Sequence, residues 1–197
     1  MPHVSHRPNP VLVAGFVLCG ASLTAAQADT AIAQSPQVET LVPGLFCAAE
    51  ERNQRAAPET IAGFVYEPVN PVAMVAEGQV VPAMIGLGFG VRFTLADAED
   101  AALDYTVTHP PMPPGMVTVQ RWGSTLTGGN VGTVFFQFDV PEELQPGDWS
   151  FAATRDGAPV FRVGFTVRPA SELPALVGLC QGGSLLSLSQ RSRAAAG

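Results

Sequence analysis

Four acidic residues that lie close together in the sequence are the side chains best suited to bind a metal ion. They are Asp97, Glu99, Asp100 and Asp104. Carboxylate oxygens spaced this closely in a loop are ligands that Ca²⁺ accepts. Their spacing does not follow the EF-hand pattern, and no glycine marks a wrap around an ion. We therefore favour a solvated acidic loop, with a calcium site as the alternative.

His109 is the single histidine after residue 28, and this limits the catalytic chemistry. A Ser-His-Asp or Cys-His group would have to use it, and a zinc site needs several nitrogen or sulfur ligands. Glu142 and Glu143 are adjacent, so on an extended segment they point apart, and neither is an obvious acid or nucleophile. We expect no catalytic residue and no cofactor. His109 is interpreted as a strand-end imidazole that donates to a backbone carbonyl.

A proline-rich segment beside this histidine is the candidate partner-binding loop. It consists of His109, Pro110, Pro111, Met112, Pro113 and Pro114. Polyproline segments dock into aromatic grooves because they lose little conformational entropy on binding. A rigid connection between two strands is the simpler interpretation, and both stay open.

The first 28 residues have the order of a secretory signal peptide. A basic start at Arg7 is followed by an apolar stretch at 11–23 and a small-x-small cleavage site at 26–28. The apolar stretch is shorter than the ~20 residues that a membrane span normally requires. We expect cleavage before Asp29, a periplasmic or secreted protein, and no membrane span after cleavage. A retained anchor is the alternative.

Cys47 and Cys180 are the two cysteines that follow this segment. An even number of cysteines in an oxidising compartment predicts one disulfide, here between the first strand and the last segment of the domain. Two separate buried thiols are the alternative. A redox-active pair is less favoured, because there is no Cys-x-x-Cys spacing and no flanking cation to lower a thiol pKa.

Composition excludes some classes of partner. The formal net charge is -7 and the chain contains no lysine. A protein without basic clusters cannot neutralise a phosphate backbone or dock electrostatically on anionic lipid. The length predicts one domain at 39–181, with a flexible spacer at 29–38 and a flexible tail at 182–197. The polar stretch 48–60 is expected to be helical turns or a mobile loop.

Apolar and polar residues alternate along several short stretches, which is typical of strands with one buried face. The clearest lie at 91–96, 103–108, 134–140 and 161–168. Asp156-Gly157 predicts a tight hairpin, Trp149 a core anchor, and the glycines at 86–90 close packing or a bulge. The pattern predicts an all-β fold: a two-sheet antiparallel sandwich, immunoglobulin-like in general build.

Several short motifs occur in an order known from one protein family. They are Gly88-Phe89-Gly90-Val91-Arg92-Phe93, His109-Pro110-Pro111, the run from Phe138-Asp139-x-Pro141 to Pro146-Gly147-x-Trp149, and Phe165-Thr166-Val167. In these residues the chain resembles an uncharacterised bacterial family, domain of unknown function 3859, over about Val80 to Val167. The resemblance implies an exported β domain and says nothing about substrate.

Two functions from different classes remain. The first is an exported non-catalytic binding module that presents its surface to an unknown protein or envelope partner. The alternative is an envelope hydrolase that uses carboxylates, or a calcium-dependent carbohydrate-binding domain built on the acidic loop. The alternative predicts a bound ion, or paired carboxyl groups with raised pKa values in a pocket.

Overall fold

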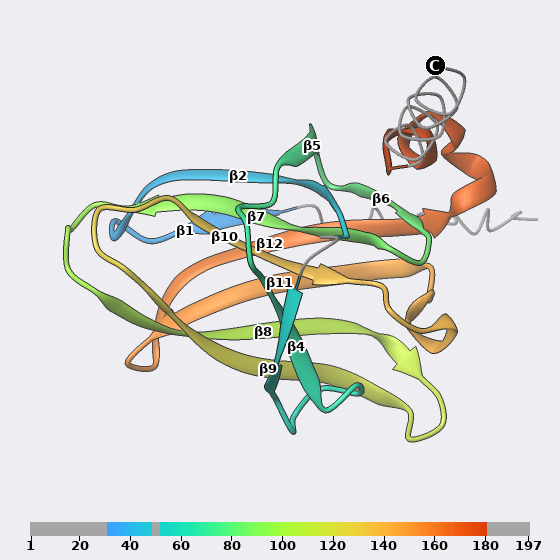
Figure 1. Ribbon diagram of the computed structural model, residues 1–197, viewed down its shortest axis with the longest axis horizontal. Helices are drawn as coiled ribbons and strands as arrows, with labels where there is room; N and C mark the ends of the chain where they lie inside the picture. Colours follow the sequence, from blue (N-terminus) through green and yellow to red (C-terminus); the bar gives the residue numbers. More distant parts are fainter. Residues whose placement is uncertain (1–30, 49–51, 181–197) are drawn as a thin grey trace, which may run out of the picture.

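The computed structural model describes residues 31–48 and 52–180, so the predicted signal peptide and C-terminal tail lie outside the described residues. Two sheets face each other (Figure 1). The first sheet has the order β1-β12-β11-β8-β9, with β6 also paired to β12, and the second has the order β10-β7-β2-β5. All the pairings are antiparallel except that of β6 with β12. The predicted two-sheet sandwich is confirmed.

The strand bounds are as follows. The first sheet contains β1 (Ile32–Gln34), β6 (Val80–Ala83), β8 (Ala101–Met112), β9 (Val117–Leu126), β11 (Gly147–Arg155) and β12 (Ala158–Pro169). The second contains β2 (Val38–Cys47), β5 (Met74–Glu77), β7 (Leu87–Leu95) and β10 (Gly132–Gln137). A separate two-stranded hairpin is formed by β3 (Arg52–Ala56) and β4 (Phe64–Pro68).

Aromatic side chains fill the space between the two sheets. Phe89 of β7 lies at the centre, with its ring centroid 5.3 Å from that of Trp149 and 5.0 Å from that of Phe165. Trp149 is only 2% exposed, and its Nε1 donates to the Gln145 carbonyl at 2.9 Å. The polar end of the indole is therefore satisfied while its apolar surface is buried. The predicted core position of Trp149 is confirmed.

Two local predictions from glycine are also confirmed. Asp156 and Gly157 have φ angles of 52° and 76°, as a type I′ turn between β11 and β12 requires. In β7, a Cβ atom at Gly90 would lie 2.1 Å from the Val134 carbonyl oxygen, so no larger residue fits beside β10. Gly88 and Gly90 therefore allow the close packing of β7 against β10.

The N-terminal boundary of the domain lies earlier than predicted. Residues 29–38 were expected to form a flexible spacer, but Ile32–Gln34 pairs with Phe161–Val163 of β12. Val38 is buried in the core. The short apolar stretch at 31–34 has no alternation long enough to indicate a strand by itself, and it is ordered by the edge of the first sheet.

The stretch 48–60 was expected to be helical turns or a mobile loop, and this was wrong for its central part. Residues Arg52–Ala56 form a strand that pairs with β4. The hairpin stands outside the sandwich core, so its strand carries no apolar alternation. Arg55 of this strand pairs with Glu67 across the hairpin.

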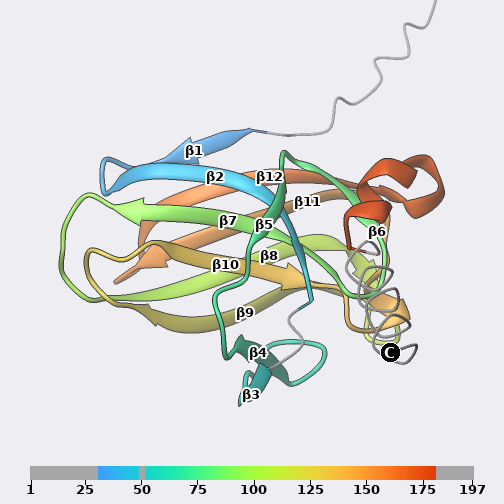
Figure 2. The ribbon, with the colours of Figure 1, turned by 45° about the horizontal axis from the view of Figure 1, so that its top comes forward.

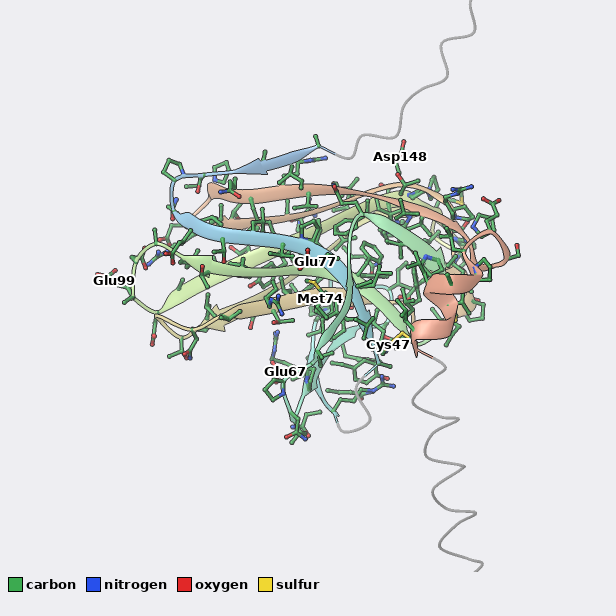
Figure 3. All side chains as sticks on the ribbon, turned by 90° about the horizontal axis from the view of Figure 1, so that it is seen from above. Cys47, Glu67, Met74, Glu77, Glu99 and Asp148 are labelled. Atoms are coloured by element: carbon green, nitrogen blue, oxygen red, sulfur yellow. A yellow bond between two sulfur atoms is a disulfide. The ribbon has the colours of Figure 1, made fainter. Side chains whose placement is uncertain are left out.

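A disulfide joins Cys47 at the end of β2 to Cys180, with a Cα–Cα distance of 5.4 Å. Cys180 lies at the end of a described helical stretch, 174–180. Figure 3 shows Cys47 beside this stretch. The predicted bridge is present. Among residues 31–48 and 52–180, no helix is long and apolar enough to cross a bilayer.

Replacing Trp149 by alanine is expected to lower the free energy of unfolding by ~3–5 kcal/mol, because the truncation leaves a cavity among the phenylalanine rings. Urea unfolding followed by circular dichroism measures the loss. Trp149→Phe keeps a ring and should lose less. An unchanged unfolding midpoint in Trp149→Ala would contradict the core role.

Candidate ligand-binding cavity

The β3–β4 hairpin lies beside the open edge of the sandwich, where β9 ends the first sheet and β10 ends the second (Figure 2). Three contacts fix the hairpin, including the loop between its two strands, to β9. Arg55 Nη2 donates to the Gly123 carbonyl at 2.7 Å, and the Arg121 amide donates to the Glu59 carbonyl at 3.2 Å. The Ile61 amide donates to Gln120 Oε1 at 2.8 Å. The hairpin is therefore held in place by backbone and side-chain groups of one edge strand.

A cavity of about 530 Å³ lies between this hairpin, the segment that follows it, and strands β8, β9 and β10. We call it the hairpin cavity. Its volume is within the range of small-ligand sites. Its aromatic lining is Phe64, Tyr66, Tyr105, Trp122, Phe135 and Phe136. Its main polar lining is Arg55, Glu67, Asn70, Gln120, Gln137, Asp139 and Glu143.

Glu143 is a buried carboxyl group in the wall of this cavity, only 3% exposed. It ends the short turn η1 (Pro141–Glu143), and its Oε2 accepts from the backbone amides of Asp139 at 2.7 Å and Val140 at 3.3 Å. Burial raises the pKa of Glu143 to about 7, against the lowering effect of these two amides, and the negative charge of Asp139 raises it further. Glu143 is thus an acid that titrates near neutral pH.

Asp139 is a second carboxyl group in the lining, close in the chain to the first. Burial raises the pKa of Asp139, while the hydrogen bond from Gln137 and the positive charge of Arg52 lower it. The guanidinium of Arg52 lies 3.8 Å from the ring centroid of Tyr66, which also lines the cavity. One end of the cavity therefore combines two carboxyl groups with an aromatic wall.

Tyr105 brings a hydroxyl group to the cavity from β8. The residue is 4% exposed, and burial raises the pKa of its phenol, so the hydroxyl keeps its proton. Among the described residues, neither this hydroxyl nor Oε1 of Glu143 forms a hydrogen bond, and no fully buried side-chain oxygen lacks one. Both atoms are therefore accessible from the cavity and open to a ligand or to water.

His109 supports the cavity wall without lining it. Its Nδ1 donates to the Pro110 carbonyl at 2.8 Å, which is the backbone contact expected from the sequence. Its Nε2 then accepts from Gln120 Nε2 at 3.3 Å, which orients the amide that holds Ile61. Burial lowers the pKa of His109, although the bond to Pro110 opposes this. The imidazole is therefore a neutral structural link between β8 and β9.

The expected partner-binding loop is not one exposed segment. His109, Pro110, Pro111 and Met112 are the last residues of β8, and His109 is 4% and Met112 0% exposed. The inward row of β8 continues to the histidine, and an irregularity before Met112 turns that side chain inward as well. The prolines at 111, 113 and 114 are exposed. The prediction that this segment binds a partner therefore remains only for these three exposed prolines.

Three of the four acidic residues of the predicted loop have other partners in this structure. Arg155 lies 2.8 Å from Asp97 and 3.8 Å from Glu99, and Asp100 accepts from the Gly128 amide at 2.8 Å. Asp104 belongs to β8, where it is exposed. Figure 3 places Glu99 at the end of the sandwich away from Cys47. Over the described part of the chain, no three His, Cys, Asp or Glu residues are grouped to hold a metal ion.

Sequence reasoning missed the residues that matter most in the cavity. Glu143 was considered, but as part of an extended segment, whereas it lies in a turn. Pro141 at the first position of that turn was the available signal, because proline favours the start of helical turns. Tyr105 and Trp122 pair across β8 and β9, and only the first was in a predicted strand.

A comparison with protein families identifies the family of this chain. Residues 34–167 match the family described as domain of unknown function DUF3859. The chain belongs to this family. The match is longer than the predicted Val80–Val167, and it contains Cys47 and every residue that lines the hairpin cavity. Cys180 lies outside it.

No curated protein matches the chain. The crystal structure of an immunoglobulin-like protein from Pseudomonas aeruginosa is similar, with 18% sequence identity and a TM-score of 0.44. The similarity covers 73% of this chain and 100% of that protein.

The buried carboxyl of Glu143 predicts a specific dependence of stability on pH. Its pKa is higher in the folded protein than in the unfolded chain, so the favourable contribution is complete below about pH 4.5 and is lost as pH rises through about 7. Glu143→Gln should remove this loss, which makes the variant more stable than the wild type at pH 8 by up to about 3 kcal/mol.

Urea unfolding of both proteins from pH 4 to pH 8 measures this difference in the free energy of unfolding. Any contribution from the titration of His109 is the same in both proteins and cancels in the difference. Glu142→Gln, which changes the exposed neighbouring residue, is the matched control and should stay close to the wild type, because the charge of Glu142 is the smallest of the effects on the pKa of Glu143. A constant difference between the wild type and Glu143→Gln across this range would contradict the prediction.

Proposed function

We propose that this chain is an exported, non-catalytic binding module of the DUF3859 family, with the hairpin cavity as its ligand site. The sandwich supplies a rigid frame, and the β3–β4 hairpin closes one side of the cavity. A concave site with aromatic walls and a few converging polar groups is the usual form of a small-ligand site. The ligand is a small molecule or a side chain of a protein partner.

The observation that carries this proposal is a pair of polar atoms available at the cavity wall. Tyr105 Oη and Glu143 Oε1 form no hydrogen bond in the described part of the chain, and neither is fully buried. A ligand that fills the cavity would remove both atoms from water, and an unpartnered buried polar group costs about 1–3 kcal/mol, so the two atoms favour a polar ligand that supplies a partner to each. Neither atom is needed for the packing of the aromatic core.

Export is supported by the disulfide and by the order of residues 1–28. Disulfides form and persist in oxidising compartments such as the periplasm and the extracellular space. The bridge between Cys47 and Cys180 closes most of the domain into one covalent loop. This combination supports a periplasmic or secreted protein.

The cavity can be tested by filling it. Ala62 lines the hairpin cavity, and Ala62→Phe should occupy part of its volume while the sandwich stays folded. In a thermal-shift screen of saccharides, amines, carboxylic acids and short peptides, compounds that raise the melting temperature of the wild type should fail to raise that of Ala62→Phe.

Ala102→Phe, on the exposed side of β8, is the matched control and should respond like the wild type. Ligands that stabilise the wild type and Ala62→Phe equally would place the binding site elsewhere and would refute the proposed site.

Export is tested by the intact mass of the protein expressed from the full sequence in a bacterial host. We expect a chain that starts at Asp29, and we expect two thiols that react with an alkylating reagent only after reduction. A full-length chain with freely reactive thiols would contradict both the cleavage and the compartment.

A second candidate function is supported by the two carboxyl groups. Asp139 and Glu143 both line the cavity with raised pKa values, and an acid with a pKa near 7 is suited to general acid catalysis. This arrangement is what the envelope-hydrolase alternative requires. Release of product from a panel of chromogenic glycosides by the wild type, and not by Glu143→Gln, would favour hydrolysis over binding alone.

A further inference from the structure

The charges in the hairpin cavity do not balance. Its lining contains the carboxyl groups of Glu67, Asp139 and Glu143 and one cationic group, that of Arg55. Arg55 is already engaged, because its Nε pairs with Glu67 and its Nη2 donates to the Gly123 carbonyl. In the described part of the chain, neither Asp139 nor Glu143 forms an ion pair. The cavity therefore presents two acidic groups that no described residue holds in an ion pair, and the positive charge of Arg52 acts only on Asp139.

The aromatic walls are also suited to a positive charge. A guanidinium or ammonium group within about 6 Å of an aromatic ring centroid is attracted to the face of the ring. The chain itself provides an example at the cavity wall, where the Arg52 guanidinium lies 3.8 Å from the centroid of Tyr66. Trp122 lines the same cavity, and tryptophan is the best ring for such contacts.

Resting on the function proposed above, we propose that the hairpin cavity binds an organic cation, an ammonium or guanidinium group carried on an apolar stem. The cation donates to Oε1 of Glu143 and lies close to Asp139, while the stem contacts Trp122. The hydroxyl of Tyr105 donates to an acceptor elsewhere on the ligand. The same chemistry is carried by a free amine and by the lysine or arginine side chain of a protein partner.

The ionisation of Glu143 links this binding to pH. The charged groups that act on it are Asp139 and Glu142, and Arg52 acts on Asp139. A pKa of about 7 means that the fraction of ionised Glu143 rises about tenfold between pH 6 and pH 8. Affinity for a cation should rise by about the same factor over this range.

Isothermal titration calorimetry at pH 8 and low salt tests the proposal with ligands that share one stem. Butylammonium and butylguanidinium are compared with butanol and butyrate. A second arm compares an extended peptide that carries one arginine with the same peptide carrying neutral citrulline. We expect the cations to bind at least about tenfold more tightly than their neutral or anionic counterparts.

The two arms distinguish the sources of the cation. Tight binding of the peptide with weak binding of the free butyl cations indicates a protein partner, and comparable binding of both indicates a small amine. Equal affinity for butanol and butylammonium would overturn the proposal, and so would failure of every cation and of the arginine peptide to bind. If another class of compound then binds in a way that Ala62→Phe abolishes, the proposed function stands and this inference alone falls.

Variants assign the effect to the named side chains. Glu143→Gln should weaken cation binding by about tenfold and abolish its dependence on pH between 6 and 8. Glu142→Gln should change both far less, because its charge is the smallest of the effects on the pKa of Glu143. Asp139→Asn is the second acidic variant and should also weaken binding. Trp122→Leu should weaken it several-fold. Retention of full affinity and of the pH dependence in Glu143→Gln would overturn the assignment.

Discussion

The packing of aromatic rings between the two sheets is the interaction on which the rest of this structure depends. Phe89 contacts Trp149 and Phe165 across the sandwich, and the indole is fixed at its polar end by the Gln145 carbonyl. Gln145 lies just after the turn that contains Glu143. The core therefore orders the segment that holds the acidic end of the cavity, and the position of Glu143 follows from the burial of Trp149.

The same core explains why most of the fold is predictable from sequence. A residue that points between the sheets must be apolar, while the next residue in the strand faces solvent. The alternation of apolar and polar residues in β8 and β12 is therefore visible directly in the sequence. The β3–β4 hairpin lies outside this core and obeys no such rule. Its strands are held by backbone pairing, by the bond of Arg55 with Glu67 and by contacts to β9, none of which leaves a periodic pattern.

The candidate site is less predictable for a related reason. It combines side chains from the hairpin, from the paired positions Tyr105 and Trp122 of two strands, and from a turn more than 20 residues further on, at Glu143. No spacing in the sequence links these positions. The carboxyl of Glu143 becomes unusual only through burial, and burial depends on how the hairpin covers the open edge of the sandwich. Sequence alone shows an acidic pair in a polar stretch.

The course of the chain places one wall of the cavity and the core of the sandwich in different segments. The chain leaves the second sheet at Cys47 and returns to it at Met74, and the strands on either side of this excursion, β2 and β5, are paired with each other. The point of departure is also fastened by the bond to Cys180. The described residues of this excursion, 52–73, contribute one wall of the cavity and little to the core. Under the proposed function, changes in the length or sequence of this segment would alter which ligand fits while leaving the sandwich intact, so in this chain the determinants of specificity are separate from those of folding.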